Sequence, residues 1–309
     1  MNDSNKKKKI ICIGECALDI VFGADGAPIG SMPGGRLANA AALLAREGLP
    51  VVMAAEAAAD AVGDTVVEFL ARAGVDTTGV DRFTEGRTPV TIYMPGADGH
   101  VKATRYEQYA DDSFDIVWPR IDEGDIVLFG GYYAIDRRMR RRMLPLLQQA
   151  AERKALMVYL PGYLPEQEPR ITRVMPAILE NLELAQVVVT RSVDLQLIFG
   201  TRDAAAAFRN HVGFYCNALV NVDAQRHTVE WHSKGHTAAL EVPLSPCGSL
   251  VWNAGVAAGT TTALYSAGAN PEMLQAGAQL LCDNVLRSAV ATADLAIAQL
   301  TSDWQKIHE

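Results

Sequence analysis

Residues 241–264 read EVPLSPCGSLVWNAGVAAGTTTAL, and this stretch governs how the rest of the chain is interpreted. Pro243 and Pro246 keep its first part extended. From Leu250 onward it carries no charge, and its many small apolar residues predict a long helix that is buried on all sides. The N-terminus of such a helix offers unpaired N–H groups and a positive dipole end, so we expect it to favour an anion.

The composition is that of a globular protein. The chain has 309 residues, of which 49% are hydrophobic and 21% are charged, and α/β folds of this length can form one domain. A net charge of −8 argues against nucleic acid or an anionic membrane as a partner. Five cysteines at scattered spacings predict reduced thiols and a cytoplasmic location. Residues 1–9 are expected to be a flexible end and not a secretory signal.

Two glycines and an asparagine stand where an alanine-rich helix is expected to begin. Gly34 and Gly35 predict a tight turn, and Asn39 follows Gly35 by four residues. Asp19 comes shortly after residues 10–13, which form a predicted buried strand, and a carboxylate can accept hydrogen bonds from two adjacent hydroxyl groups. Each feature alone is also typical of an ordinary strand–turn–helix.

A second passage follows in a characteristic order. Residues 58–64 read AADAVGD, a helix is expected over residues 65–73, and residues 74–80 read GVDTTGV. Together with the earlier glycine pair and asparagine, this order resembles the ribokinase-like (PfkB-type) carbohydrate kinases, with Ala58 in place of a glycine. We identify residues 10–110 on this basis as part of a member of that family.

The resemblance implies an α/β fold with a central, mostly parallel sheet, helices on both faces and a small β-sheet lid. The alternation of strands and helices after Ile126 independently predicts the parallel sheet. We expect one domain over residues 10–300, with lid strands within residues 15–34 and 87–110. A hairpin loop is expected at residues 96–99, which read GADG.

The resemblance also implies a ligand, cofactors and a partner. It implies a small sugar or nucleoside as ligand, ATP and Mg²⁺ as cofactors, and a homodimer formed through the lid. It further implies that the following residues contact the sugar: Asp19, Gly34, Gly35, Asn39 and, from the lid, Arg105, which would face the pocket or a partner subunit.

The phosphate-binding segment departs from the family pattern. The family carries an Asp-Thr-Thr-Gly-Ala-Gly-Asp-like segment, whose glycines bind the transferring phosphate and whose last aspartate accepts the hydroxyl proton. Here Cys247, Gly248 and Ser249 occupy the anion-hole positions, and Leu250 occupies the position of the base. A leucine cannot accept a proton, so general-base help is lost.

Two further motifs on the nucleotide side are also altered. Residues 191–194 read RSVD where the family has an Asn-x-x-Glu pattern, so Asp194 alone keeps acidic character. Asp223 and Arg226 replace glycines in a turn that would line the nucleotide. Asp194 and Asp223 are therefore interpreted as remnants of the nucleotide and metal side.

Three histidines suggest a metal site at first sight, but their predicted positions argue against it. His232 and His236 are four residues apart, yet Gly235 lies between them and residues 228–231 read as a strand. We expect these histidines and His227 to lie in strands and turns, and we expect no metal site.

Three functions remain open from the sequence. The favoured one is a carbohydrate kinase-like protein that binds a polyhydroxylated ligand while its phosphotransfer is weak or lost, that is, a pseudoenzyme. The second is an active ATP-dependent sugar kinase that uses a non-standard base. The third is a non-catalytic structural or regulatory subunit.

Overall fold

A large sheet forms the centre of the protein in the computed structural model, which describes residues 8–96, 101–109, 114, 116, 118–242, 250–276 and 279–308. Within these residues the sheet has nine strands, in the order β13 (His236–Glu241), β12 (Thr228–Ser233), β11 (Ala218–Asp223), β10 (Val187–Arg191), β9 (Leu156–Pro161), β8 (Ile126–Gly131), β1 (Ile10–Ile13), β4 (Val51–Glu56) and β5 (Asp76–Asp81). The strands from β11 to β5 are parallel, and β12 and β13 are antiparallel. The predicted α/β fold with a mostly parallel sheet is confirmed.

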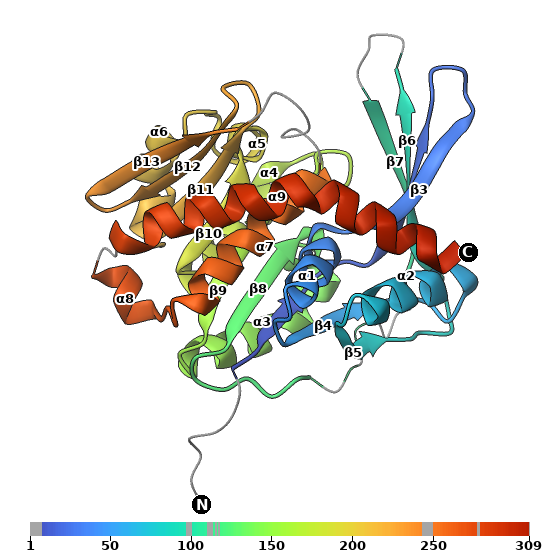
Figure 1. Ribbon diagram of the computed structural model, residues 1–309, viewed down its shortest axis with the longest axis horizontal. Helices are drawn as coiled ribbons and strands as arrows, with labels where there is room; N and C mark the ends of the chain where they lie inside the picture. The colour runs from blue at the N-terminus through green and yellow to red at the C-terminus, as the bar shows by residue number, and fades with distance from the viewer. Residues whose placement is uncertain are drawn as a thin grey trace, which may run out of the picture.

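Helices cover both faces of this sheet (Figure 1). One face carries α1 (Arg36–Arg46), α2 (Ala61–Arg72), α7 (Leu250–Ser266) and α9 (Gln279–His308). The other face carries η1 (Tyr132–Ala134), α3 (Arg137–Glu152), α4 (Ile171–Leu184), α5 (Ser192–Phe199) and α6 (Ala204–Asn210). Two short elements, η2 (Val212–Phe214) and α8 (Pro271–Gln275), complete the described helices. No helix in the described part of the chain is long and apolar enough to cross a membrane.

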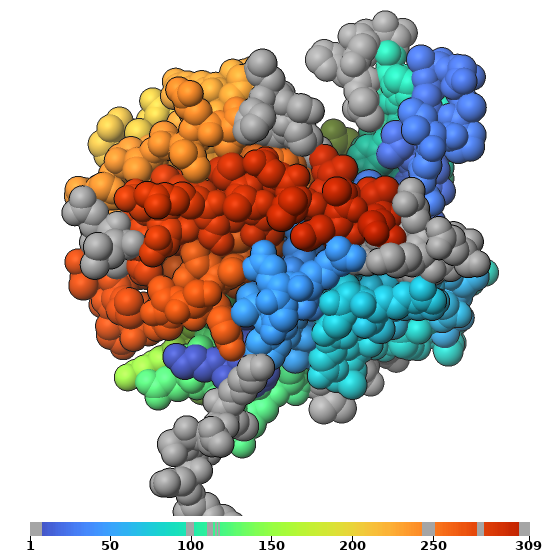
Figure 2. Space-filling view, in the orientation of Figure 1, coloured from blue at the N-terminus to red at the C-terminus, as the bar shows by residue number. Residues whose placement is uncertain are grey.

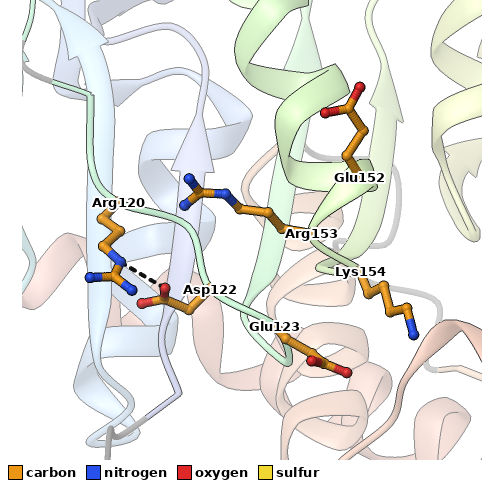
Figure 3. A pocket seen from close by; sticks show the side chains of 6 residues that line it. All are labelled: Arg120, Asp122, Glu123, Glu152, Arg153 and Lys154. Atoms are coloured by element: carbon orange, nitrogen blue, oxygen red, sulfur yellow. Dashed lines mark hydrogen bonds and ion pairs between the residues drawn. The ribbon is translucent and has the colours of Figure 1, made fainter. Parts of the chain in front are cut away.

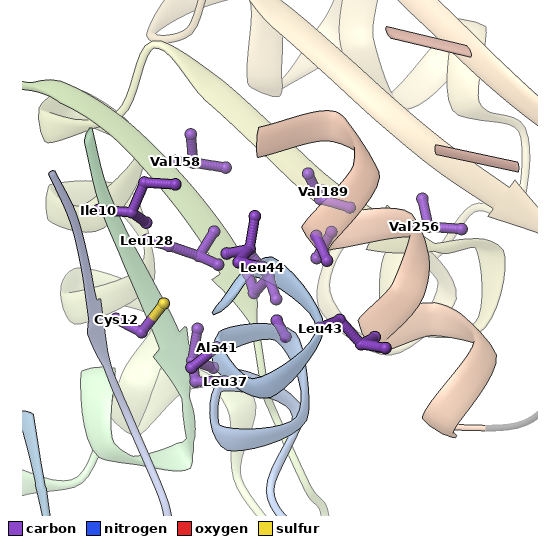
Figure 4. Close-up of a cluster of buried hydrophobic side chains, with 14 of the residues drawn as sticks. Ile10, Cys12, Leu37, Ala41, Leu43, Leu44, Leu128, Val158, Val189 and Val256 are labelled. Atoms are coloured by element: carbon purple, nitrogen blue, oxygen red, sulfur yellow. The ribbon is translucent and has the colours of Figure 1, made fainter. Parts of the chain in front are cut away.

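Two hydrophobic clusters hold these layers together. Successive side chains of a strand point to opposite faces, so in β1 Ile10 and Cys12 join one cluster and Ile11 and Ile13 join the other. Figure 4 shows the first cluster, where Leu44 of α1 packs among side chains from the strands. The parallel strands are thus buried on both faces, as their continuous apolar sequences require.

Helix α7 is buried, as its uncharged sequence predicts. Trp252 is fully buried, and its indole N–H donates to Asp294 of α9 at 3.1 Å. A Cβ atom at Gly259 would overlap the backbone of Ser288, so this glycine allows α7 and α9 to pack closely. Figure 2 shows α9 on the outer surface beside α1. The small residues of α7 that are described therefore admit a neighbouring helix.

A second, four-stranded sheet projects from the body (Figure 1). Its order is β3 (Pro28–Gly34), β2 (Ala17–Phe22), β6 (Arg87–Pro95) and β7 (Val101–Gln108). Strands β2 and β3 lie in the sequence between β1 and β4, and β6 and β7 lie between β5 and β8. We call this sheet the lid. Residues 97–99 of the expected hairpin loop, which spans residues 96–99, lie outside the described residues.

Three local features differ from the sequence prediction. Helix α2 begins at Ala61 and not at residue 65, because Asp60 caps it by accepting a 2.8 Å hydrogen bond from the Gly63 N–H. Strand β5 was missed because it begins with Asp-Thr-Thr-Gly, residues that are typical of turns. Helix α5 was missed because it has only 8 residues and shows little amphipathic pattern.

Candidate active site

The sheet contains a point where the strand order reverses. From β1 the chain continues to β4 and β5 on one side, and from β8 onward it fills the other side. In open α/β sheets ligands bind beyond the carboxyl ends of the strands at such a point. Glu15 follows β1, and its Oε1 accepts a 2.8 Å hydrogen bond from the N–H of Tyr132, which follows β8. The lid begins at the same edge, so we place the candidate site there.

A second hollow in the surface lies at the opposite edge of the sheet. It has a volume of about 620 Å³ and is lined by Arg120, Asp122, Glu123, Glu152, Arg153 and Lys154 (Figure 3). These residues precede β8 and β9, at the amino ends of the strands. Their three basic and three acidic side chains balance in charge, and Arg120 pairs with Asp122 at 2.8 Å. This hollow has neither the location nor the charge expected of the active site.

The residues predicted to contact sugar are close together at the base of the lid. Asp19 of β2 is half-buried, and its Oδ1 would lie 2.5 Å from a Cβ atom at position 34. Gly34 therefore leaves room for the Asp19 carboxylate. Gly35 has a φ of 96°, and a Cβ atom there would overlap the backbone carbonyl of Glu15. Both glycines are thus required by close approaches at this junction.

Asn39 has an unsatisfied polar atom in this region. It lies in the first turns of α1 with 4% of its surface exposed, and its Nδ2 donates to the carbonyl oxygen of Pro33 at 3.2 Å. Its Oδ1 is buried and has no hydrogen-bond partner within the described residues. A buried acceptor without a donor costs about 1–3 kcal/mol. A ligand hydroxyl or a water molecule is therefore expected to donate to Asn39.

Arg105 connects the lid to the body. Its guanidinium lies 3.1 Å from Glu15 Oε2 and 2.6 Å from Glu107 Oε2, and it donates to the Tyr109 hydroxyl at 3.1 Å. Its side chain is only 16% exposed. Arg105 thus points toward the junction with the body, next to the predicted sugar contacts.

The electrostatics of this junction affect Asp19. Burial raises the pKa of its carboxyl group to about 6, although hydrogen bonds from Thr91 and Tyr93 and the charge of Arg105 act in the opposite direction. Asp19 therefore changes its charge close to neutral pH.

Glu56 lies in the same hydrogen-bonded network but deeper in the protein. It is fully buried at the end of β4, and its Oε1 lies 3.1 Å from the Tyr133 hydroxyl. The Tyr133 hydroxyl is also 3.1 Å from that of Tyr109, which contacts Arg105. Burial raises the pKa of Glu56 to about 8. At neutral pH this carboxyl group is mostly protonated.

We predict that Glu56→Gln stabilises the protein at alkaline pH. The folded-state pKa of about 8 lies above the ordinary value of 4.5, so the folded state binds the proton more tightly. The wild-type free energy of unfolding should therefore fall as the pH rises from 4.5 to 8. Glutamine does not titrate, and the variant should be more stable by about 2–4 kcal/mol at pH 8.

Urea denaturation measured across this pH range checks this prediction. The matched control is Glu183→Gln, which removes an exposed carboxylate from α4. If the free energy of unfolding of Glu56→Gln depends on pH in the same way as that of the wild type and of Glu183→Gln, the raised pKa of Glu56 is wrong.

Asp194, which the sequence analysis assigns to the nucleotide side, is enclosed by two arginines. Its side chain is 1% exposed, and it accepts hydrogen bonds from the Arg191 side chain at 2.9 and 2.5 Å and from the Arg191 backbone N–H at 3.2 Å. Arg36 of α1 contacts the same carboxylate at 3.4 Å and also donates to the carbonyl oxygen of Pro161. Burial opposes ionisation of Asp194, but the two guanidinium groups hold its pKa below the ordinary value.

Asp223 stabilises its own turn. Its Oδ1 accepts hydrogen bonds from the backbone N–H groups of Gln225 at 2.9 Å and Arg226 at 3.0 Å. The Arg226 side chain is 66% exposed and lies 3.8 Å from Asp223 Oδ2. Asp223 thus stabilises this turn through its own side chain, at a position where the sequence comparison with the family leads us to expect glycine.

Comparison with known proteins agrees with this geometry. The pattern that describes pfkB family carbohydrate kinases matches residues 7–213, which is more than half of the chain. This protein belongs to the pfkB family of carbohydrate kinases. The resemblance inferred from the sequence motifs is confirmed. Among curated proteins, no sequence matches this pfkB family member.

Solved structures of pfkB-type kinases share its fold. A fructokinase from Xylella fastidiosa with bound ATP matches with a TM-score of 0.76 and 18% identity, over 98% of this chain and 100% of that one. A fructokinase from Vibrio cholerae O395 with bound fructose, ADP and calcium ion matches with a TM-score of 0.75 and 16% identity. The match covers 94% of this chain and 92% of that one. Aminoimidazole riboside kinase from Salmonella enterica, complexed with aminoimidazole riboside and an ATP analogue, matches with a TM-score of 0.75 and 14% identity. The match covers 98% of this chain and 100% of that one.

The two acidic residues that the sequence analysis assigns to the nucleotide side, Asp194 and Asp223, do not fit Mg²⁺. This ion needs oxygen ligands in near-octahedral geometry, but the Asp194 carboxylate is occupied by guanidinium groups and Asp223 Oδ1 by two N–H groups. Within the described residues, no group of three or more His, Cys, Asp or Glu side chains could hold a metal. His232 and His236 lie in β12 and β13 and His227 in the turn before them, in agreement with the sequence prediction.

The segment that carries the catalytic base in the pfkB family is only partly described. Leu250 is the first residue of α7, and the first turn of this helix has no acidic residue. Cys247, Gly248 and Ser249 lie outside the described residues. The replacement of the base by leucine stays a prediction from the sequence, and Leu250 lies at the start of the buried helix, where that prediction places it.

Three residues of the site were given no role by the sequence analysis. At the carboxyl edge of the sheet, Glu15 pairs with Arg105 of the lid, and Arg36 and Arg191 both contact Asp194. Glu15 and Arg191 each stand at or just after the end of a buried parallel strand, which is a signal that could have identified them. Arg36 has no such local signal, because its partners come from distant parts of the chain.

Proposed function

We propose that this pfkB family protein binds a small polyhydroxylated ligand, a sugar or nucleoside, where the lid meets the sheet. The observation that carries the proposal is the buried, unpartnered Oδ1 of Asn39 near the half-buried carboxylate of Asp19. A ligand hydroxyl can donate a hydrogen bond to either oxygen. The fructose and aminoimidazole riboside named for the similar structures are ligands of this chemical class.

We further propose that phosphate transfer is slow or absent. Leu250 begins the helix whose first turn would carry the base, and Asp194 is held in ion pairs. The polyol side of the site thus keeps its polar groups, while the phosphate side has lost a proton acceptor and a free carboxylate. ATP and Mg²⁺, which the family implies, are correspondingly doubtful cofactors for this chain.

A homodimer through the lid and a cytoplasmic location stay predictions. Ile29, Met94 and Tyr106 are exposed on lid strands and are the apolar surface that a second copy would cover. Sedimentation equilibrium would detect such a dimer.

The ligand proposal predicts a pH-dependent affinity. Ionised Asp19 is the stronger acceptor, so polyol binding should strengthen about tenfold as the pH rises from 5 to 7 and Asp19 loses its proton. Without ligand the sign is opposite: the pKa of Asp19 lies above the ordinary 3.8 in the folded state, so ionisation lowers stability as the pH rises through this range.

Thermal shift and calorimetry with sugars, nucleosides and nucleotides tested separately measure this effect. Asp19→Asn should flatten the pH profile, while Asp25→Asn, a change at an exposed lid carboxylate, should leave it intact. A response to nucleotides with none to polyols would refute the proposal.

A further inference from the structure

We propose that Glu56 is a positioning residue for the lid: through two tyrosine hydroxyls it holds Arg105 and the base of β7 in place, and this hold weakens when Glu56 ionises. Glu56 belongs to the body, at the end of β4, whereas Arg105 belongs to β7 of the projecting lid (Figure 1). The inference concerns the movement of the lid and does not depend on which ligand the protein binds.

The first argument is an unbroken chain of polar contacts from the lid to the buried acid. The Arg105 guanidinium donates to the Tyr109 hydroxyl at 3.1 Å. The Tyr133 hydroxyl lies 3.1 Å from that of Tyr109 and 3.1 Å from Glu56 Oε1. Arginine can only donate and each hydroxyl has one proton, so donation running from Arg105 toward Glu56 gives every member a partner. Tyr109 directly follows β7, so the chain of contacts passes from the lid to the body there.

The second argument is the aromatic packing around this chain of contacts. The Tyr109 ring packs against those of Tyr133 and Phe83, with centroids 5.9 and 6.1 Å apart. Phe114 packs against Tyr133 at 5.8 Å, and Glu56 has no exposed surface. Because Tyr109 joins β7 to this packing, a movement of β7 that carries Tyr109 away would let water reach the Glu56 carboxyl group. We call that arrangement the open position.

The third argument is the cost of a charge at Glu56. Its Oε2 is buried and has no hydrogen-bond partner within the described residues, so an ionised carboxylate would lack a donor for one oxygen. Burial raises the pKa of Glu56 to about 8, whereas water in the open position would return it toward the ordinary 4.5. The closed position therefore binds the proton more tightly, and a rise in pH favours the open position.

The groups that face Glu56 leave this direction unchanged. Burial is the largest influence on its pKa and opposes ionisation, as does the negative charge of Asp81 in β5. Hydrogen bonds from Tyr133 and from the Phe114 backbone and the charge of Arg138 in α3 favour ionisation, but the pKa still rises. Further titratable groups around the chain of contacts are Cys16, Tyr109 and the two carboxylates that pair with Arg105, those of Glu15 and Glu107.

Hydrogen–deuterium exchange of the full chain at pH 6 and pH 8, read by mass spectrometry, tests the proposal. After correction for the chemical exchange rate at each pH, the amides of β7 should open up to about 50-fold more often at pH 8. The pKa values of 4.5 in water and about 8 in the folded protein set this limit. Amides of β10, within the large sheet, should stay better protected than those of β7, because the lid opens without global unfolding.

The variant Glu56→Gln should remove this acceleration, because glutamine does not titrate. Circular dichroism shows whether the variant folds. A role of Glu56 in global stability alone would change the opening of β7 and β10 by the same factor and to the same level, since only unfolding would then expose the side chain.

A pair of tyrosine variants tests the chain of contacts without any change at Glu56. Tyr109→Phe keeps the ring but removes a hydroxyl from the chain of contacts, so β7 should open about 2- to 10-fold more often at pH 6, the effect of losing one hydrogen bond. The matched control is Tyr106→Phe, because Tyr106 also lies on β7 but is 60% exposed.

Four outcomes would each overturn the proposal. They are an opening of β7 that does not depend on pH, an acceleration that persists in Glu56→Gln, equal opening of β7 and β10, and an effect of Tyr106→Phe as large as that of Tyr109→Phe. The wild-type pH profile and the two tyrosine variants decide the matter even if Glu56→Gln does not fold.

Discussion

Replacement of Asp194 by asparagine is expected to lower the free energy of unfolding by about 3–5 kcal/mol. The wild-type carboxylate is almost fully buried and is the counter-ion of two guanidinium groups. Its oxygens lie 2.5 and 2.9 Å from the Arg191 side-chain nitrogens and 3.4 Å from Arg36 Nη1. An asparagine oxygen can still accept a hydrogen bond, but it carries no charge. Two buried cations would then remain without a counter-ion, which is the costly arrangement.

Urea denaturation followed by circular dichroism measures this loss. Asp203→Asn is the matched control, because Asp203 is an exposed residue that caps α6 by accepting from the Ala206 N–H at 3.1 Å. Asparagine caps a helix about as well, so that variant should change stability by less than about 0.5 kcal/mol. If Asp194→Asn is as stable as the control, the ion pairs are not formed and Asp194 is available as a ligand.

The second large effect concerns catalysis. We expect the unmodified chain to consume ATP, with any sugar or nucleoside, at least about 10²-fold more slowly than the ~1–100 s⁻¹ usual for kinases. Leu250 cannot accept the hydroxyl proton, and the first turn of α7 offers no other acid. General-base catalysis alone accounts for about 10²–10⁴-fold.

Restoration of the base tests this reasoning. Leu250→Asp alone should do little, because Cys247 and Ser249 place Cβ atoms where the family has glycine. The combination of Cys247→Gly, Ser249→Gly and Leu250→Asp is expected to restore some turnover in an ATP-consumption assay. The matched control carries the same glycines with Leu250→Asn, which changes the loop but adds no base. Sugar-dependent turnover in the usual range by the unmodified chain would show that another group acts as base.

Much of the fold could be predicted from local patterns. Continuous apolar runs identified β1, β8, β9 and β10, because parallel strands are buried on both faces. The uncharged sequence after Leu250 identified the buried helix α7. The pattern failed where local chemistry is ambiguous. Asp76–Asp81 has a turn-like composition but gains strand pairing from β4, and the eight residues of α5 are too few to show a period.

The sequence by itself determined the family and the mostly parallel sheet, and it predicts the loss of a proton acceptor at position 250. These depend on the kind and spacing of residues along the chain, which are visible without coordinates. Only the tertiary structure decided that Asp194 is enclosed by Arg36, 158 residues away, and that Arg105 of the lid pairs with Glu15. Local patterns encode strand and helix periods, whereas ion pairs between distant residues form only when the carboxyl ends of several strands meet at one edge of the sheet.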